Sequence, residues 1–164
     1  MEIEDRKLSK YLSFYEAVIT EHRSLYKTNM EQAQKFIPVL EVLGRTIIDP
    51  IREHYNSPYI ITSCFRCVEL NEAVGGVADS QHCLGQACDG HILGVSLEDL
   101  FYWIWHDSDL KYGQVILEGG TEMHPAWVHV SLGEPYREIS RCREAWRMIN
   151  GKYTLIAKNG IMVQ

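Results

Sequence analysis

Two histidines and one aspartate, His82, Asp89 and His129, have the residue types of a metal-binding set. His82 follows a glycine-containing loop, Asp89 lies on or beside the next strand, and His129 is in the middle of the strand-like run Trp-Val-His-Val-Ser. Two neutral imidazoles and one carboxylate are a suitable ligand set for zinc, and they leave the fourth coordination position to water. A polar ring between Val128 and Val130 needs a buried partner. That partner is either a metal ion or an ordinary hydrogen bond, and the spacing alone leaves both open.

A catalytic zinc ion is usually assisted by a nearby carboxylate base. The candidates for this base are Glu118 and Glu122, with His124 as a third. Glu118 ends the strand-like segment Gln-Val-Ile-Leu-Glu, which should pair beside the strand that carries the last histidine of the set. A residue at a strand end is held by rigid backbone, whereas Glu122 lies inside a loop. We therefore favour Glu118 as the base.

The segments around these residues predict an α+β fold, in which helices precede and interrupt a small sheet. Apolar residues spaced by three or four predict helices, and short β-branched or alternating runs predict strands. The expected helices are Tyr11–His22, Met30–Tyr55, Ser96–His106 and Tyr136–Ile149. The expected strands are Pro58–Ser63, Gly85–Ile92, Gln114–Glu118 and Trp127–Leu132. A hairpin-like tail is expected around Tyr153–Ala157. Pro50 follows Asp49, so Asp49 caps a new helical segment or the helix kinks there.

Length and composition fit one domain, residues 1–164, of an ordinary globular protein. The formal net charge is -6 and no basic cluster is present, which argues against a protein that binds nucleic acid. The sequence shows no signal peptide and no apolar run near the ~20 residues that cross a bilayer. We therefore expect a soluble monomer without a membrane span, synthesised in the cytoplasm.

The chain contains five cysteines, and an odd number without a secretion signal speaks against a disulfide framework. Reduced, mostly buried thiols are the simplest interpretation. The alternative is a structural zinc site made from Cys64 and Cys67 together with Cys83 and Cys88, although the spacing of the second pair is unusual for a zinc knuckle.

The stretch from Ser80 to Asp89, Ser-Gln-His-Cys-Leu-Gly-Gln-Ala-Cys-Asp, resembles the S-x-H-x-x-G-x-A-x-D signature of the zinc D-Ala-D-Ala carboxypeptidases of family M15. That family includes peptidoglycan endopeptidases and shares its fold with the Hedgehog signalling domain. The resemblance therefore implies a small antiparallel sheet that carries a zinc site and packs against N-terminal and middle helices. Further segments resemble the family in the same order along the chain: Asp49–Arg52, Ile61–Arg66, Leu70–Gly76 and Trp127–Ser131. The resemblance covers a core of about residues 45–132, between a helical lead-in and a C-terminal helix and tail, and it is strongest to the short, phage-associated branch.

The resemblance implies that the histidine and aspartate set holds one zinc ion, with Glu118 as the general base. It also implies that Arg66 steadies the substrate's oxyanion or carboxylate and that Ser80 forms a hydrogen bond with the substrate. The implied reaction is hydrolysis of a peptide bond in peptidoglycan stem peptides or cross-links, by a carboxypeptidase or an endopeptidase. We favour an endopeptidase that acts in phage lysis, like an endolysin, at the bacterial cell wall after release.

The sequence departs from the family pattern in two places. The family's Gly-Tyr-Arg-Ser is replaced by the segment from Cys64 to Cys67, which lacks a tyrosine hydroxyl. Some relatives place the base three residues before the last histidine, where this chain has Ala126. The assignment of Glu118 therefore depends on strand order. The alternative function is a non-catalytic, zinc-containing binding protein of the same fold.

Overall fold

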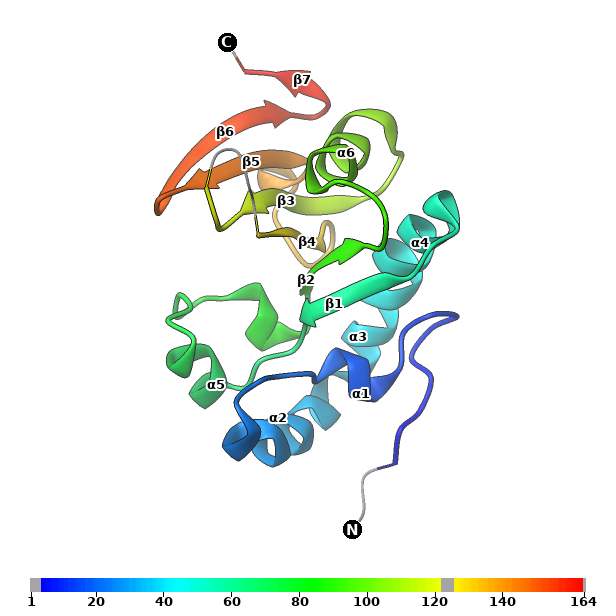
Figure 1. Ribbon diagram of the computed structural model, residues 1–164, viewed down its shortest axis with the longest axis vertical. Helices are drawn as coiled ribbons and strands as arrows, with labels where there is room; N and C mark the ends of the chain where they lie inside the picture. The colour runs from blue at the N-terminus through cyan, green and yellow to red at the C-terminus, as the bar shows by residue number, and fades with distance from the viewer. Residues whose placement is uncertain (1–3, 122–125, 164) are drawn as a thin grey trace.

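The computed structural model of the chain describes residues 4–121 and 126–163, and it has the predicted α+β architecture. The strands are β1 (Tyr59–Ser63), β2 (Ala87–Ile92), β3 (Tyr112–Glu118), β4 (Trp127–Leu132), β5 (Glu144–Ile149), β6 (Lys152–Lys158) and β7 (Ile161–Met162). They form a seven-stranded sheet in the order β1-β2-β4-β3-β5-β6-β7. In Figure 1 its C-terminal strands lie at the end of the molecule opposite the N-terminus. The first four strands match the expected segments closely.

The sheet is larger than the small antiparallel sheet that the sequence predicted, and it is mixed. Strand β5 runs parallel to β3, while the other neighbouring strands are antiparallel. The expected helix Tyr136–Ile149 is wrong, since a short 3₁₀ helix, Ile139–Arg141, is followed by β5. Asn150 and Gly151 connect β5 to β6 with φ values of 50° and 77°. Positive φ at both central residues is typical of two-residue hairpin turns, so this Asn-Gly pair is the local signal that favours a hairpin.

The described helices are α1 (Phe14–Ala17), α2 (Tyr26–Ala33), α3 (Ile37–Leu43), α4 (Asp49–Tyr55), α5 (Val68–Ala73) and α6 (Leu97–Tyr102). The helix expected over Met30–Tyr55 is therefore divided, with α3 and α4 joined by a π-helical turn, Gly44–Ile48. The helix expected over Tyr11–His22 is reduced to α1. Within the described ranges, no helix is both long enough and apolar enough to cross a membrane.

Asp49 does not cap α4 through its side chain. Its carboxylate instead accepts hydrogen bonds from the Ser9 hydroxyl at 2.7 Å and from the backbone N–H groups of Lys10 and Tyr11 at 3.1 and 3.0 Å. Asp49 thereby attaches the N-terminal segment to α4.

The core lies between the helices and one face of the sheet. Helix α6 packs on β2, β3 and β4, as Figure 1 shows. The apolar side of the divided helix faces the same core, with Leu40, Leu43, Ile47, Ile48 and Ile51 each at most 1% exposed. The opposite face of the central strands is therefore free to carry polar side chains.

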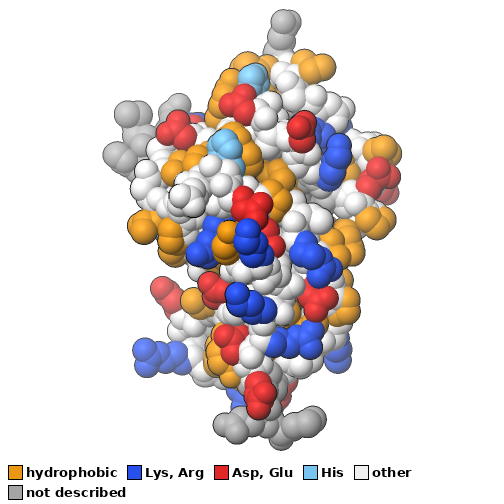
Figure 2. All heavy atoms as spheres, turned by 90° about the vertical axis from the view of Figure 1, so that its right-hand side faces the viewer, with side chains coloured by type: hydrophobic (Ala, Val, Ile, Leu, Met, Phe, Trp, Pro, Cys, Tyr) orange, Lys and Arg blue, Asp and Glu red, His pale blue; other side chains and the backbone are white. Residues whose placement is uncertain are grey.

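The face that carries α4 has acidic and basic side chains next to each other (Figure 2). Arg6 pairs with Glu41 at 3.0 Å, and Lys10 pairs with Glu53 at 2.8 Å. Exposed ion pairs of this kind contribute little, about 0–1 kcal/mol each. The fold therefore depends on the apolar core more than on this charged face.

Asn29 on α2 connects the N-terminal helices to the segment that follows β1. It is fully buried, and its Nδ2 donates hydrogen bonds to the carbonyl oxygens of Val18 and Phe65, both at 3.1 Å. Its Oδ1 accepts a hydrogen bond from the Cys67 N–H at 2.7 Å. One amide thus fixes the backbone of residues 65–67 from both sides.

Asn29→Asp should lower the free energy of unfolding by roughly 3 kcal/mol, because a carboxylate oxygen would then face two carbonyl oxygens without water. Urea denaturation measures this change. Asn159→Asp makes the same atomic replacement on an exposed turn, and we expect a change within about 0.5 kcal/mol. Equal destabilisation of the two variants would contradict the role given to Asn29.

Candidate metal centre

His82 is positioned by a short 3₁₀ helix, Gln81–Leu84, that precedes β2. Ser80 caps this helix, because its hydroxyl oxygen accepts a hydrogen bond from the His82 N–H at 3.3 Å. Gly85 ends the helix at a φ of 67°, a left-handed conformation that glycine adopts without steric cost. The local sequence therefore fixes the place of the imidazole.

The hydrogen bond from His82 to the backbone determines which of its ring nitrogens carries the proton. Nδ1 lies 2.6 Å from the carbonyl oxygen of Cys64. A carbonyl oxygen can only accept, so Nδ1 carries the hydrogen and Nε2 of the neutral ring presents a lone pair. Histidines that bind metals are commonly oriented in this way by a backbone carbonyl.

Asp89 and His129 are brought together by the register of β2 and β4, in which they are direct partners. Directly opposed residues project from the same face of a sheet. The Nδ1 atom of His129 lies 2.8 Å from Oδ1 of Asp89. The Nε2 atom of His82 lies 3.2 Å from each of these two atoms. The sequence prediction that the three side chains meet is confirmed.

The three atoms form a triangle with edges of 2.8 to 3.2 Å. A tetrahedral zinc ion with bonds of about 2.0–2.1 Å holds its ligand atoms about 3.3 Å apart, so the triangle approximates one face of such a site. The lone pair of His82 faces a carboxylate oxygen, and this contact is favourable only when a cation or a proton is shared between them. The group could hold a metal ion and would leave one coordination position for water.

The charges in the cluster favour the forms that bind a metal. Burial opposes ionisation of Asp89, but His82 and His129 outweigh it and hold the pKa of this carboxyl well below its ordinary value. Burial lowers the pKa of His82 below its ordinary value, although the negative charge of Asp89 opposes this shift. Near neutral pH the cluster therefore offers a carboxylate and an unprotonated imidazole, as metal ligation requires.

Arg66 is attached to the cluster itself. Its Nη2 donates to Oδ2 of Asp89 at 2.7 Å, and its Nε donates to the Ser63 hydroxyl at 2.7 Å. The guanidinium thus holds the outer oxygen of Asp89, while the inner oxygen faces the two histidines. The resemblance implied a substrate contact for Arg66, and its contact with Asp89 arises when the end of β1 folds against β2.

Glu118 lies at the end of β3, on the same face of the sheet as the cluster. Ile116 is the direct partner of His129 across β3 and β4, and Glu118 follows it by two residues. Its side chain is half-buried and accepts a hydrogen bond from the Tyr153 hydroxyl at 3.2 Å. The alternative bases, Glu122 and His124, lie outside the described residues.

The cysteine-based zinc site is not formed. Among the residues that the structure describes, His82, Asp89 and His129 are the one group of metal-ligating side chains close enough to share an ion. All five cysteines are free thiols, and Cys83 is half-buried while the others are buried. Burial raises the pKa of Cys88 to about 12 and that of Cys64 well above its ordinary value, which is typical of inert core thiols.

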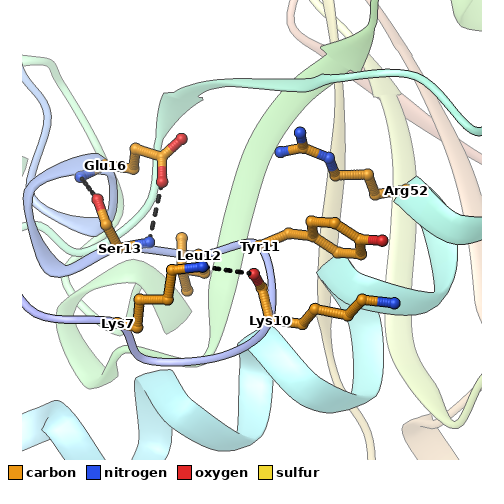
Figure 3. Close-up of a pocket in the computed structure, with 7 residues that line it drawn as sticks. All are labelled: Lys7, Lys10, Tyr11, Leu12, Ser13, Glu16 and Arg52. Atoms are coloured by element: carbon orange, nitrogen blue, oxygen red, sulfur yellow. Dashed lines mark hydrogen bonds between the residues drawn. The ribbon is translucent and has the colours of Figure 1, made fainter.

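A pocket of about 240 Å³ lies elsewhere, against the N-terminal segment and α4 (Figure 3). It is lined by Lys7, Lys10, Tyr11, Leu12, Ser13, Glu16 and Arg52. Most of its charged groups are already engaged with the protein: Lys10 pairs with Glu53, Arg52 stacks on the Tyr11 ring, and Glu16 accepts from the Ser13 N–H. These lining groups therefore make their contacts within the protein.

The family model described as Peptidase M15 matches residues 14–131 of the chain. The matched range includes the histidine and aspartate cluster, Arg66 and Glu118, and it ends before β5 and β6. No curated protein matches the chain.

His82→Ala should lower the affinity for zinc by more than about 100-fold, because loss of an outer partner of a ligand alone costs 10–100-fold. Metal content after dialysis and competition with a chromophoric chelator measure the change. His106→Ala is the matched control, since that exposed ring is hydrogen-bonded to Asp107 instead. A His82→Ala protein that retains one tightly bound zinc ion per chain would contradict the assignment.

Proposed function

The chain belongs to the peptidase M15 family, and we propose on this premise that it hydrolyses a peptide bond in peptidoglycan stem peptides or cross-links with one bound zinc ion. The observation that carries the proposal is the buried triangle formed by His82, Asp89 and His129. The choice of peptidoglycan is supported by the motif from Ser80 to Asp89, which resembles that of the wall-cleaving members. The proposed role in phage lysis follows from the likeness to the phage-associated branch.

His82, Asp89 and His129 would hold the zinc ion through Nε2, Oδ1 and Nδ1. When bound, zinc supplies the Lewis acidity that activates water and polarises the scissile carbonyl. Asp89 contributes the negative charge that holds a dication, and Arg66 keeps its carboxylate in place. His82 and His129 would supply the two imidazole nitrogens of the ligand set.

Glu118 acts as the general base in this proposal. Its carboxylate takes a proton from the attacking water and then delivers it to the nitrogen of the departing amine, so that protons balance over the reaction. The half-buried end of β3 suits this task, because the backbone is held by β4 while the carboxylate stays open to solvent.

Arg66 and Ser80 contact the substrate in the proposal, each with the hydrogens that the protein leaves available. The Nη1 group of Arg66 makes no hydrogen bond within residues 4–121 and 126–163, and it can donate to a carbonyl oxygen that gains negative charge. The oxygen of Ser80 already accepts from the His82 N–H, so Ser80 would donate its hydroxyl hydrogen to the substrate.

The non-catalytic alternative makes Glu118 the decisive residue. Arg66 and Ser80 both have structural tasks in the metal cluster, since one holds Asp89 and the other caps the helix of His82. Their presence is therefore expected in a zinc-binding protein with or without hydrolytic activity. Glu118 has no such contact with the ligands, so its effect on turnover distinguishes the two functions.

Digestion of purified peptidoglycan by the zinc-loaded protein should release fragments whose masses identify the cleaved bond. A chelator should abolish the release and added zinc should restore it. Glu118→Gln should lower kcat by about 10²- to 10⁴-fold, because the amide cannot accept the proton, while the zinc content stays the same.

Glu21→Gln is the matched control, because it changes the same atoms on an exposed side chain, and its kcat should equal that of the wild type. Zinc-loaded wild type that releases no fragments would reject peptidoglycan hydrolysis. A fully active Glu118→Gln protein would reject Glu118 as the base. Release of terminal D-alanine indicates a carboxypeptidase, and release of cross-linked or stem fragments indicates an endopeptidase.

A further inference from the structure

The hairpin formed by β5 and β6 brings Tyr153 to the residue proposed as the base. Strand β5 continues the sheet beside β3, where Leu117 is the partner of Arg147. Side chains alternate between the two faces of a sheet, so the next residues, Glu118 and Met148, lie side by side on the face opposite to that of Leu117 and Arg147. Tyr153 is the partner of Met148 across β5 and β6, so Glu118, Met148 and Tyr153 lie next to one another on the same face of three neighbouring strands.

The Tyr153 hydroxyl reaches past Met148 to the side chain of Glu118. Its oxygen lies 3.2 Å from Oε1 of the carboxylate, and because an ionised carboxylate can only accept, the phenol donates. Within the part of the chain that the structure describes, this is the one hydrogen bond to the Glu118 carboxylate, so Oε2 is left for another donor. Tyr153 is 50% exposed, and the pair therefore remains accessible from solvent.

Tyr153 keeps its proton over the range in which a base would act. Partial burial, together with the negative charge of Glu118, raises the pKa of Tyr153 to about 12. At neutral pH the phenol is therefore a donor and cannot replace Glu118 as the proton acceptor. Its two aromatic χ angles also make it a stiff support compared with a long aliphatic side chain.

We propose that Tyr153 is a positioning residue, whose hydroxyl fixes one oxygen of Glu118 and leaves the other for the attacking water. This inference rests on the proposed function. The tight turn at Asn150 and Gly151 sets the register of the hairpin. The backbone of Tyr153 is therefore held in place by its pairing with β5, and this fixes the position of the hydroxyl. The hairpin lies beyond residues 14–131, which makes Tyr153 an addition to the site from outside the matched range.

Tyr153→Phe removes the hydroxyl and keeps the ring. We expect kcat to fall by about tenfold, because the base then samples unproductive orientations, with KM within about twofold of the wild type and the zinc content unchanged. Tyr102→Phe is the matched control: its ring is exposed to a similar extent, 46%, and its hydroxyl forms no hydrogen bond with the described residues. Its kcat should be that of the wild type.

A second measurement tests the pair without using activity. Carbon-13 NMR of labelled tyrosine follows the titration of Tyr153 in the zinc-loaded protein. The pKa of Tyr153 should be lower in Glu118→Gln than in the wild type, because a negative charge beside the phenol is lost. Glu21→Gln should leave this titration unchanged.

An unchanged kcat in Tyr153→Phe overturns the inference, as does an effect confined to KM or an equal loss in Tyr102→Phe. An unchanged titration of Tyr153 in Glu118→Gln overturns it as well. These results leave the proposed function intact when the wild type cleaves peptidoglycan. Absence of cleavage by the zinc-loaded wild type rejects the proposed function itself and the positioning role with it.

Discussion

The register between β2 and β4 places Asp89 directly opposite His129, and the candidate metal cluster that they form with His82 depends on this pairing. Side chains alternate between the two faces of a sheet, so a shift of one residue would turn one of the two into the apolar core. The adjacent pair, Cys88 and Val130, lies on the core side of the sheet, where both residues are fully buried. The same alternation that packs the core against α6 therefore holds the polar residues on the other face.

The carboxylate of Asp89 is the centre to which the other polar groups are attached. A buried carboxylate is costly unless it is paired and hydrogen-bonded. Arg66 satisfies its outer oxygen, and the histidines approach its inner oxygen. The three atoms that meet here, one nitrogen of each histidine and one carboxylate oxygen, can all accept hydrogen bonds. A single shared proton cannot satisfy all three contacts between them. A dication would relieve that shortage of hydrogen-bond donors, and this is why the donor set fits a metal ion better than an ordinary hydrogen-bonded triad.

The residue types and spacing of His82, Asp89 and His129 left a metal ion and an ordinary hydrogen bond both open, and the metal set was predicted from the motif that runs from Ser80 to Asp89 and the strand that carries His129. The contacts of Arg66 with Asp89 and of His82 with the Cys64 carbonyl were not predictable, since they require β1 and β2 to be assembled. The C-terminal helix was predicted wrongly for a related reason. Apolar residues there recur at helical spacing, at Tyr136, Ile139, Cys142, Trp146 and Ile149. Pairing of β5 with β3 and the tight turn after it outweigh that local pattern.

Strand β3 connects the metal cluster to the C-terminal hairpin. On one side it pairs with β4 beside His129, and on the other it pairs in parallel with β5. If β5 were absent, β3 would be an edge strand with unpaired backbone groups, and such edges fray and associate with other chains. Glu118 stands at the last residue of β3, where fraying would act first. The hairpin therefore supports the proposed base in two ways, through the backbone of β3 and through the Tyr153 hydroxyl. The proposed site therefore extends beyond the matched range to the residues of this hairpin.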